Sequence, residues 1–442
     1  MSTKNYVPRA VFQKLEELVA HYKTIQSSDQ PHILIDQWLS FCLGDIPVPE
    51  FVDSTSGTPN FLSPNSAIKD YQLALGFLYS YRGSSDTFVA YRRDLERFIQ
   101  WSWFVRGQSV LSHRRGDIEA FVEFCQKPPK RWIGFKKVPR FTTINGEKAP
   151  NPEWRPFEIH LSKVDHKKGT VVRDKDKYQF SQQALKSLFG VIGSFYNYLL
   201  QEEISQINPV SMIRQKSKFI QKQSSAAMVR RLSNAQWEMV LECAKEKAIK
   251  NKSYERTVFM LSCLYAMYLR ISELAATDRW TPTMGDFTKD SENNWWFKTI
   301  GKGNKVRQIA VSSSMLDAVK HYRIQYLELP PLPTLNEKTP LIGHIKNTNK
   351  PVTSTRPIRE IVQQCFYDAA DQLEQAGKTE EANGLRIATV HWLRHTGISE
   401  DVKTRPREHV RDDAGHSSSA ITDKYIDIER RERAKSARDK KL

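Results

Sequence analysis

The spacing of apolar residues predicts helices over most of the chain. Within residues 85–103, apolar side chains recur at the three- and four-residue steps of one helix face, at Phe88, Tyr91, Leu95, Phe98 and Ile99. The same spacing predicts a helix from about Ser181 to Glu203, and the almost wholly apolar stretch 257–269 predicts a buried helix. Residues 295–311 instead favour two short strands joined by a Gly-rich turn, which is typical of a hairpin. We therefore expect a mainly α-helical protein with a small β-hairpin or sheet.

Two stretches without this periodicity divide the chain. Residues 53–67 are rich in Ser, Thr, Pro, Asn and Gly, and residues 214–231 are basic with few large apolar side chains. The resulting prediction has four parts: an N-terminal helical extension and linker (1–65), a helical domain (66–213), a basic interdomain linker (214–232) and a second domain (233–442).

The charge of the chain indicates a polyanionic partner. Its 442 residues contain 67 Lys or Arg against 50 Asp or Glu, which gives a net charge of +17. Residues 127–180, a predicted insertion in the helical domain, hold 14 Lys or Arg and 6 Asp or Glu. Its prolines and glycines predict loops or a short hairpin. The insertion is interpreted either as solvated or as an extra contact with a nucleic-acid backbone.

Several classes of protein are disfavoured by what the sequence lacks. No apolar run reaches the ~18–20 residues of a membrane span, and no secretory signal is readable. ATPase, zinc-protease and serine-hydrolase motifs are missing as well. We expect a reduced, cytoplasmic protein without a metal site, because five cysteines lie far apart in the sequence: Cys42, Cys125, Cys243, Cys263 and Cys365.

Five short motifs in the second domain could carry chemistry. Alone, each has an ordinary explanation: Arg270 could simply pair with Glu273, and a turn lysine or a single tyrosine is usually a surface or packing residue. His391 and Arg394 are three residues apart and therefore share a helix face. In chain order the motifs are L-R-I-S-E-L with Arg270, G-K-G-N-K with Lys302, H-W-L-R-H with His391 and Arg394, G-H-S with His416, and Tyr425 nine residues further on.

In this order and spacing, the motifs resemble those of the tyrosine recombinases, or phage integrase family. The resemblance covers residues 233–430 and implies an α+β catalytic domain. Residues 85–210 are similar to the family's helical core-binding domain, which contacts DNA. Three features depart from the family pattern: the insertion at 127–180, the long segment between Lys302 and His391, and Ala414 where Leu is usual.

The resemblance implies DNA cleavage and religation without metal, cofactor or ATP. Tyr425 would attack the scissile phosphate and form a 3′-phosphotyrosine, since a phenol of pKa ~10 can react when it is activated. Arg270 and Arg394 would bind the non-bridging oxygens and His416 would donate a further hydrogen bond. Lys302 would protonate the leaving 5′-oxygen, and His391 would act as acid or base.

The partners implied are double-stranded DNA with specific recombination sites and a homo-tetramer on that DNA, with accessory proteins and a nucleoid-associated location also open. The reaction could be integration, excision, resolution or transposition of a mobile element. Residues 429–442, a basic tail, would either be a solvated end or contact a neighbouring protomer or DNA. Candidates for DNA contact are Arg92, Arg93, Lys305, Lys216 and Lys218.

Two other functions are alternatives to recombination. A type IB topoisomerase would use the same residue types at a single DNA site. A DNA-binding protein without catalysis would need no intact set of motifs.

Overall fold

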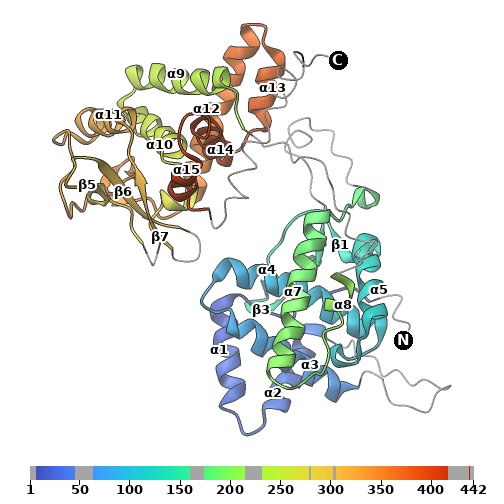
Figure 1. Ribbon diagram of the computed structural model, residues 1–442. Helices are drawn as coiled ribbons and strands as arrows, with labels where there is room; N and C mark the ends of the chain where they lie inside the picture. The colour runs from blue at the N-terminus through green and yellow to red at the C-terminus, as the bar shows by residue number, and fades with distance from the viewer. Residues whose placement is uncertain are drawn as a thin grey trace. The chain divides into compact units, whose positions relative to one another are not determined.

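The computed structural model describes residues 6–44, 63–159, 174–214, 231–277, 280–301, 305–416 and residue 438. The chain divides into two compact units, Met1–Gln223 and Ser224–Leu442 (Figure 1). The division falls within residues 214–232, the predicted linker, most of which lies outside the described residues.

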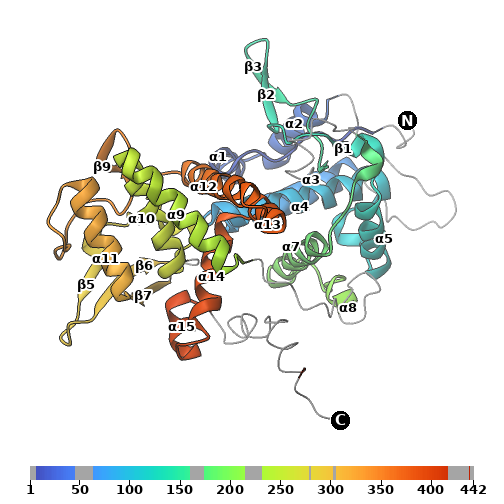
Figure 2. The same cartoon turned by 90° about the horizontal axis from the view of Figure 1, so that it is seen from above.

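The first unit consists of helices with two short strand pairs. Its helices are α1 (Leu15–Gln26), α2 (Pro31–Leu43), α3 (Pro64–Ser80), α4 (Ser85–Trp101), α5 (Arg115–Gln126), α7 (Gln182–Gln201) and α8 (Ser211–Arg214). Strands β1 (Ile133–Gly134) and β4 (Phe157–Glu158) pair in parallel, and β2 (Phe141–Ile144) and β3 (Glu147–Pro150) form an antiparallel hairpin (Figure 2). The hairpin turn, Asn145–Gly146, has positive φ at both residues, as a two-residue turn of this kind requires. The insertion therefore contains a short hairpin, as its prolines and glycines predicted.

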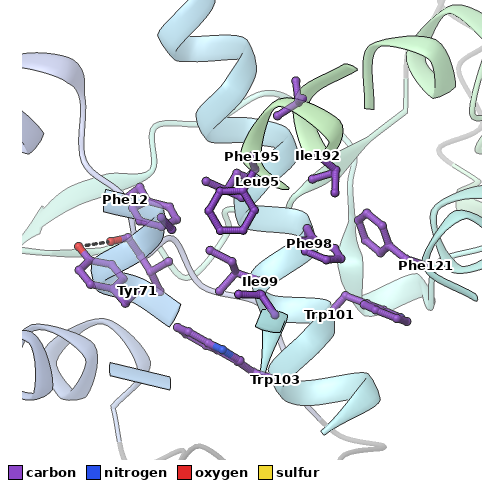
Figure 3. Packing of buried hydrophobic residues seen from close by; sticks show 14 of the residues in the cluster. Phe12, Tyr71, Leu95, Phe98, Ile99, Trp101, Trp103, Phe121, Ile192 and Phe195 are labelled. Atoms are coloured by element: carbon purple, nitrogen blue, oxygen red, sulfur yellow. Dashed lines mark hydrogen bonds between the residues drawn. The ribbon is translucent and has the colours of Figure 1, made fainter. Parts of the chain in front are cut away.

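One aromatic-rich core holds the first unit together. Phe98, Trp101 and Phe121 lie close to one another across α4 and α5 (Figure 3). The predicted apolar face of α4 is confirmed, because Phe88, Leu95, Phe98 and Ile99 are all fully buried. Leu18 of α1 and Ile35 of α2 belong to the same core. The N-terminal helices are thus part of the first unit and not an extension outside it.

The second unit places a small sheet beside a group of helices. The helices are α9 (Asn234–Lys250), α10 (Glu255–Ala266), α11 (Ser313–Tyr322), α12 (Thr355–Gln375), α13 (Thr379–Ile387), α14 (Val390–Asp401) and α15 (Arg407–Ala414). The strands are β5 (Phe287–Lys289), β6 (Trp295–Ile300), β7 (Val306–Ala310), β8 (Gly343–His344) and β9 (Asn347–Pro351). Strands β5, β6 and β7 form an antiparallel sheet in which Ile300 pairs with Val306, which confirms the predicted hairpin. The predicted fold class, mainly helical with a small sheet in the second domain, is confirmed.

The described residues also bear on the expectations about membrane spans and cysteines. None of the helices described is both long and apolar enough to cross a bilayer. All five cysteines are buried free thiols.

A buried carboxylate ties α3 to the segment that follows α4. Asp70 is fully buried and accepts hydrogen bonds from Trp103 Nε1 (3.0 Å), Ser109 Oγ (2.7 Å) and the Val110 amide (3.0 Å). Burial raises the pKa of Asp70 to about 6, although these hydrogen bonds act in the opposite direction.

We predict that Asp70→Asn lowers the free energy of unfolding by about 2–3 kcal/mol at pH 8, because the amide nitrogen cannot accept two of these bonds. The folded-state pKa exceeds the ordinary value, so the wild type gains stability as pH falls from about 6 to 4. The deficit of the variant should therefore grow over this range in urea titrations. An equal deficit at pH 8 and pH 4.5, or the same deficit in the exposed control Asp36→Asn, would contradict this account of Asp70.

Candidate active site

Four elements of the second unit converge on the predicted motifs. The end of α10 leads through Tyr268 to Arg270, which precedes the 3₁₀ turn Ile271–Glu273. Helix α14 carries His391 and Arg394, α15 ends just before His416, and the β6–β7 turn begins at Gly301. Figure 1 shows α14 beside α10 and α15 beside β7, and close contacts confirm both pairs.

Helix α14 approaches the end of α10 so closely that only glycine fits at one position. A Cβ atom on Gly397 would lie 2.1 Å from the Tyr265 carbonyl oxygen. The missing side chain therefore allows the helix that carries two predicted site residues to lie directly against the segment before Arg270.

The centre of the site is Glu273, a carboxylate only 2% exposed. Arg307 of β7 donates to it through both Nη atoms, each at 2.8 Å, and Arg270 donates through its backbone amide and Nη1, also at 2.8 Å. Burial opposes ionisation of this carboxyl, but the hydrogen bonds and charge of the two arginines win and lower the pKa of Glu273. The Arg270–Glu273 pair considered from sequence is therefore present, within a three-residue cluster.

Arg307 connects this cluster to the C-terminal side of the site. Its Nε donates to the Asp413 carbonyl at 3.0 Å, and the Asp413 carboxylate accepts from Arg405 Nη2 at 2.6 Å. Gly415, in the left-handed conformation, lies against Arg307, since a Cβ there would be 2.9 Å from Arg307 Cδ. The chain then turns to His416 beside the cluster.

The first residue of the β6–β7 turn, Gly301, lies beside the cluster of Glu273, Arg270 and Arg307. A Cβ on Gly301 would lie 2.9 Å from Arg307 Nη1 and 3.4 Å from Arg270 Nη1. Lys302 follows directly in the sequence but lies outside the described residues, and Lys305 is an exposed residue immediately before β7.

Arg394 is a second arginine fixed by the fold. Its side chain is 2% exposed, Nη1 donates to the Tyr268 carbonyl, and Nη2 donates to the Ala414 carbonyl at 2.5 Å. It therefore joins the residues just before Arg270 to the residues just before His416. Since the backbone of Ala414 makes this contact, the small side chain at this departure from the family pattern leaves it intact.

Three histidines lie in the positive field of these arginines. His391 and His395 are in edge-to-face contact at 4.4 Å between ring centroids. Burial, together with the charges of Arg394 and Arg270, lowers the pKa of His391, and the same causes lower the pKa of His416 to about 4. Burial and the neighbouring His391 and Arg394 lower the pKa of His395 to about 3. All three imidazoles are therefore neutral at pH 7 in a site whose arginines favour an anion.

Four of the predicted site residues lie close together in the structure: Arg270, His391, Arg394 and His416. Four others, Lys302, Tyr425, Lys216 and Lys218, lie outside the described residues. In the first unit, Arg92 donates to the Gln13 carbonyl and Arg93 forms a two-pronged pair with Asp94. Among the residues described, no group of three or more His, Cys, Asp or Glu side chains is arranged to hold a metal ion.

Sequence reasoning missed Arg307, Asp413 and Arg405. A signal for Arg307 was available, because it is two residues from the fully buried Ile309 on the same strand and therefore shares its face. An arginine on a buried strand face requires a partner, and that partner is Glu273.

We predict that Arg270→Gln raises the pKa values of His391 and His416, because it removes a positive charge that lowers both. Glu273 would keep its two bonds from Arg307, so the fold should persist. Proton NMR titration of the histidine rings between pH 4 and 8 measures the change. The control Arg386→Gln removes a charge from α13 and should leave both values in place; equal shifts in the two variants would show that Arg270 does not share the site.

No family model matches the chain, and no curated protein matches it. Among solved structures, the chain is similar to the XerH site-specific recombinase bound to palindromic difH substrate in a post-cleavage complex (14% identity, 98% of this chain and 99% of that chain, TM-score 0.48). It is also similar to a lambda integrase dimer bound to a COC′ core site (11% identity, 86% and 83%, TM-score 0.47) and to the Tn1549 transposon integrase in complex with a circular intermediate DNA (14% identity, 82% and 98%, TM-score 0.45). The solved structures named here are a site-specific recombinase and two integrases.

Proposed function

We propose that the protein is a tyrosine recombinase that cuts and rejoins DNA through a 3′-phosphotyrosine. The observation that carries this proposal is the convergence of Arg270, His391, Arg394 and His416 around one positively charged site. These residues are up to 146 positions apart in the sequence, yet each lies in the motif order of the family.

The two arginines fit the role of holding the scissile phosphate. The transition state of phosphoryl transfer spreads negative charge over the non-bridging oxygens, and fixed guanidinium groups stabilise such charge without rearranging. Arg394 is held by two carbonyls and Arg270 by Glu273, so both would be in place before DNA arrives. Arg270 retains 27% exposure, which leaves it accessible to a ligand.

The histidines fit the roles of proton acceptor and hydrogen-bond donor. A neutral imidazole can accept a proton from a phenol, and its other nitrogen can donate to a phosphate oxygen. Burial and the charges of the arginines lower the pKa values of His391 and His416, and the negative charge of a bound phosphate would offset the contribution of the arginines. DNA binding would thus raise both pKa values and help His391 to take up the proton of the attacking hydroxyl.

Tyr425 and Lys302 complete the mechanism through their positions in the motifs. Tyr425 would attack phosphorus, the bond to the 5′-oxygen would break, and Lys302 would supply the proton for that oxygen. Support for Lys302 comes from Gly301, which lies against Arg307 and Arg270 at the start of the same turn. The phosphotyrosine bond would conserve the energy needed for religation.

The wider assembly follows from the same proposal. Duplex DNA with specific recombination sites would be the substrate, and four protomers would act on two sites, with accessory proteins directing integration, excision, resolution or transposition of a mobile element. The reaction would take place in the cytoplasm, at the nucleoid. Lys305 would contact DNA beside the site, with Lys216 and Lys218 in the linker; the basic tail 429–442 would contact a neighbouring protomer or DNA.

We predict that Tyr425→Phe abolishes covalent attachment to a nicked suicide duplex and changes duplex binding less than twofold. The variant loses the nucleophilic hydroxyl and keeps the ring. Denaturing gels measure the adduct and gel shifts measure binding. A covalent adduct formed by the Phe variant would refute the assignment of Tyr425 as the nucleophile.

The wild-type protein distinguishes the two alternative functions. Plasmid relaxation without any site dependence would favour a type IB topoisomerase, and DNA binding without an adduct would favour a non-catalytic DNA-binding protein.

We predict that Lys302→Ala slows cleavage of ordinary DNA by ~10²–10⁴-fold, the usual contribution of an acid–base group. Cleavage of a duplex with sulfur in place of the 5′ leaving oxygen should be slowed much less, because a thiolate leaves without a proton. Single-turnover rates on both substrates provide the comparison, with Lys305→Ala as the matched turn variant. Equal losses on oxygen and sulfur substrates in Lys302→Ala would remove Lys302 from the acid role.

A further inference from the structure

The first unit contains a basic cavity, all of whose lining residues belong to that unit. It has a volume of about 830 Å³ and is formed by the start of α1, α4, the insertion and the start of α7. Of its 22 lining residues, nine are Lys or Arg and two are Glu. Such an excess of one charge in a concave surface concentrates a field that attracts anions.

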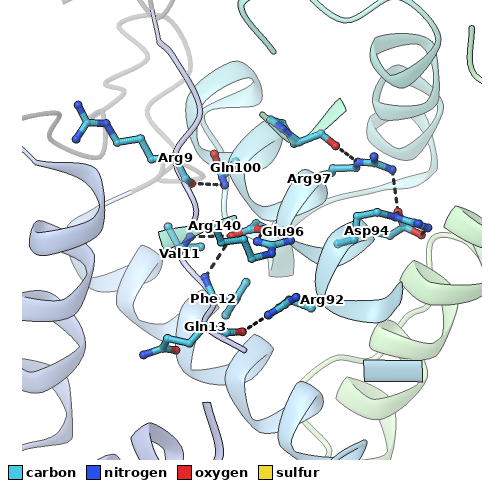
Figure 4. Close-up of polar contacts among 12 residues, drawn as sticks. Arg9, Val11, Phe12, Gln13, Arg92, Asp94, Glu96, Arg97, Gln100 and Arg140 are labelled. Atoms are coloured by element: carbon cyan, nitrogen blue, oxygen red, sulfur yellow. Dashed lines mark hydrogen bonds and ion pairs between the residues drawn. The ribbon is translucent and has the colours of Figure 1, made fainter. Parts of the chain in front are cut away.

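The inner wall of the cavity is held by two buried carboxylates. Glu96, which is fully buried, accepts hydrogen bonds from the Val11 amide (2.7 Å) and the Phe12 amide (3.2 Å) and pairs with Arg140 of the insertion (Figure 4). The insertion is thereby fixed to α4 and to the N-terminal segment.

Asp94, two residues earlier on α4, has the same role. It is 1% exposed, and it pairs with Arg97 at 2.9 Å and Arg93 at 2.8 Å. Arg97 also donates to the Pro156 carbonyl at 2.7 Å, a second tie between α4 and the insertion (Figure 4). Both carboxylates are buried, whereas the side chain of Arg93 is 46% exposed and those of Arg97 and Arg140 are 12% and 14% exposed.

Two like charges are forced together in this wall. Burial, with the nearby charge of Arg140, lowers the pKa of Arg92 to about 10. A bound anion would relieve this repulsion. The rim of the cavity adds Lys137 and Lys177, both exposed and both from the insertion.

We propose that this cavity is a binding site for the phosphodiester backbone of duplex DNA, built by the insertion onto α4. The inference rests on the proposed function, because it assigns the anion to the same DNA that the second unit would cut. The chemistry is that of cations at fixed positions and flexible lysines at a rim, which recognises phosphates without reading bases. The insertion thus adds sequence-independent affinity to the protein.

The test compares two double variants of the full chain that lose the same charge. Lys137→Gln with Lys177→Gln changes the rim, and Lys23→Gln with Lys69→Gln changes two exposed lysines of the same unit that do not line the cavity. The probes are two 40-base-pair duplexes of unrelated sequence, and the measurement is the dissociation constant between 50 and 300 mM salt.

The rim variant should lower the slope of log affinity against log salt by about 2, since each lost phosphate contact removes about one unit. At 0.15 M salt this corresponds to roughly 30-fold weaker binding, because each contact contributes about (1/0.15)^0.9, or ~5-fold. The loss should be equal on both duplexes and the control should change binding less than twofold. Covalent adduct formation at saturating nicked duplex should be unchanged.

Three outcomes would overturn the inference. Equal losses in the rim and control variants would make the effect one of net charge alone. A loss confined to one duplex sequence would indicate base reading, and an unchanged salt slope in the rim variant would show that the cavity does not contact the backbone. In each of these cases adduct formation by the wild type would leave the proposed function standing, whereas a wild type that binds neither duplex would overturn both.

Discussion

A buried carboxylate, Glu273, is the group on which the candidate active site depends. Burying a charge is costly unless it is paired and hydrogen-bonded, and Glu273 meets both conditions through Arg270 and Arg307. Because these arginines come from different elements, the pairing fixes the turn after α10 against the sheet. Arg307 extends the connection to the carbonyl of Asp413 at the end of α15. Removal of Glu273 would leave two cations close together and would disconnect three parts of the chain at once.

The same arrangement occurs in the first unit. There Asp94 and Glu96 on α4 pair with arginines of α4 and of the insertion, again with the carboxylates buried and the guanidinium groups partly exposed. Guanidinium forks bound to a carboxylate on one side keep donors available on the other, so a rigid cationic surface results. In both units, therefore, the interior acid sets the position of cations that can meet a phosphate. In the second unit, burial together with the charges of Arg394 and Arg270 lowers the pKa values of His391 and His416.

Much of the fold was predictable because local patterns dominate it. The apolar face of α4, the helix α7 and the β6–β7 hairpin follow from spacing and turn residues alone. The grouping of Arg270, His391, Arg394 and His416 was predictable only through the motif order, since no local rule brings together residues so distant in the sequence. The roles of Asp413 and Arg405 were not predictable, because they depend on which helix ends meet. The packing of α1 and α2 into the first core was missed for a similar reason: a polar stretch in the sequence does not prevent the helices on either side of it from sharing a core.

Identification of the bond between protein and DNA tests the proposed recombinase activity most directly. A nicked suicide duplex incubated with the wild-type chain, then digested with protease and nuclease, yields the linked peptide for mass spectrometry. We predict a single peptide in which Tyr425 carries the 3′-phosphate, together with a DNA strand whose free 5′-hydroxyl can be labelled by a kinase without prior phosphatase treatment. Attachment through another residue, a linkage to the 5′ end, or cleavage with no covalent product would contradict this prediction.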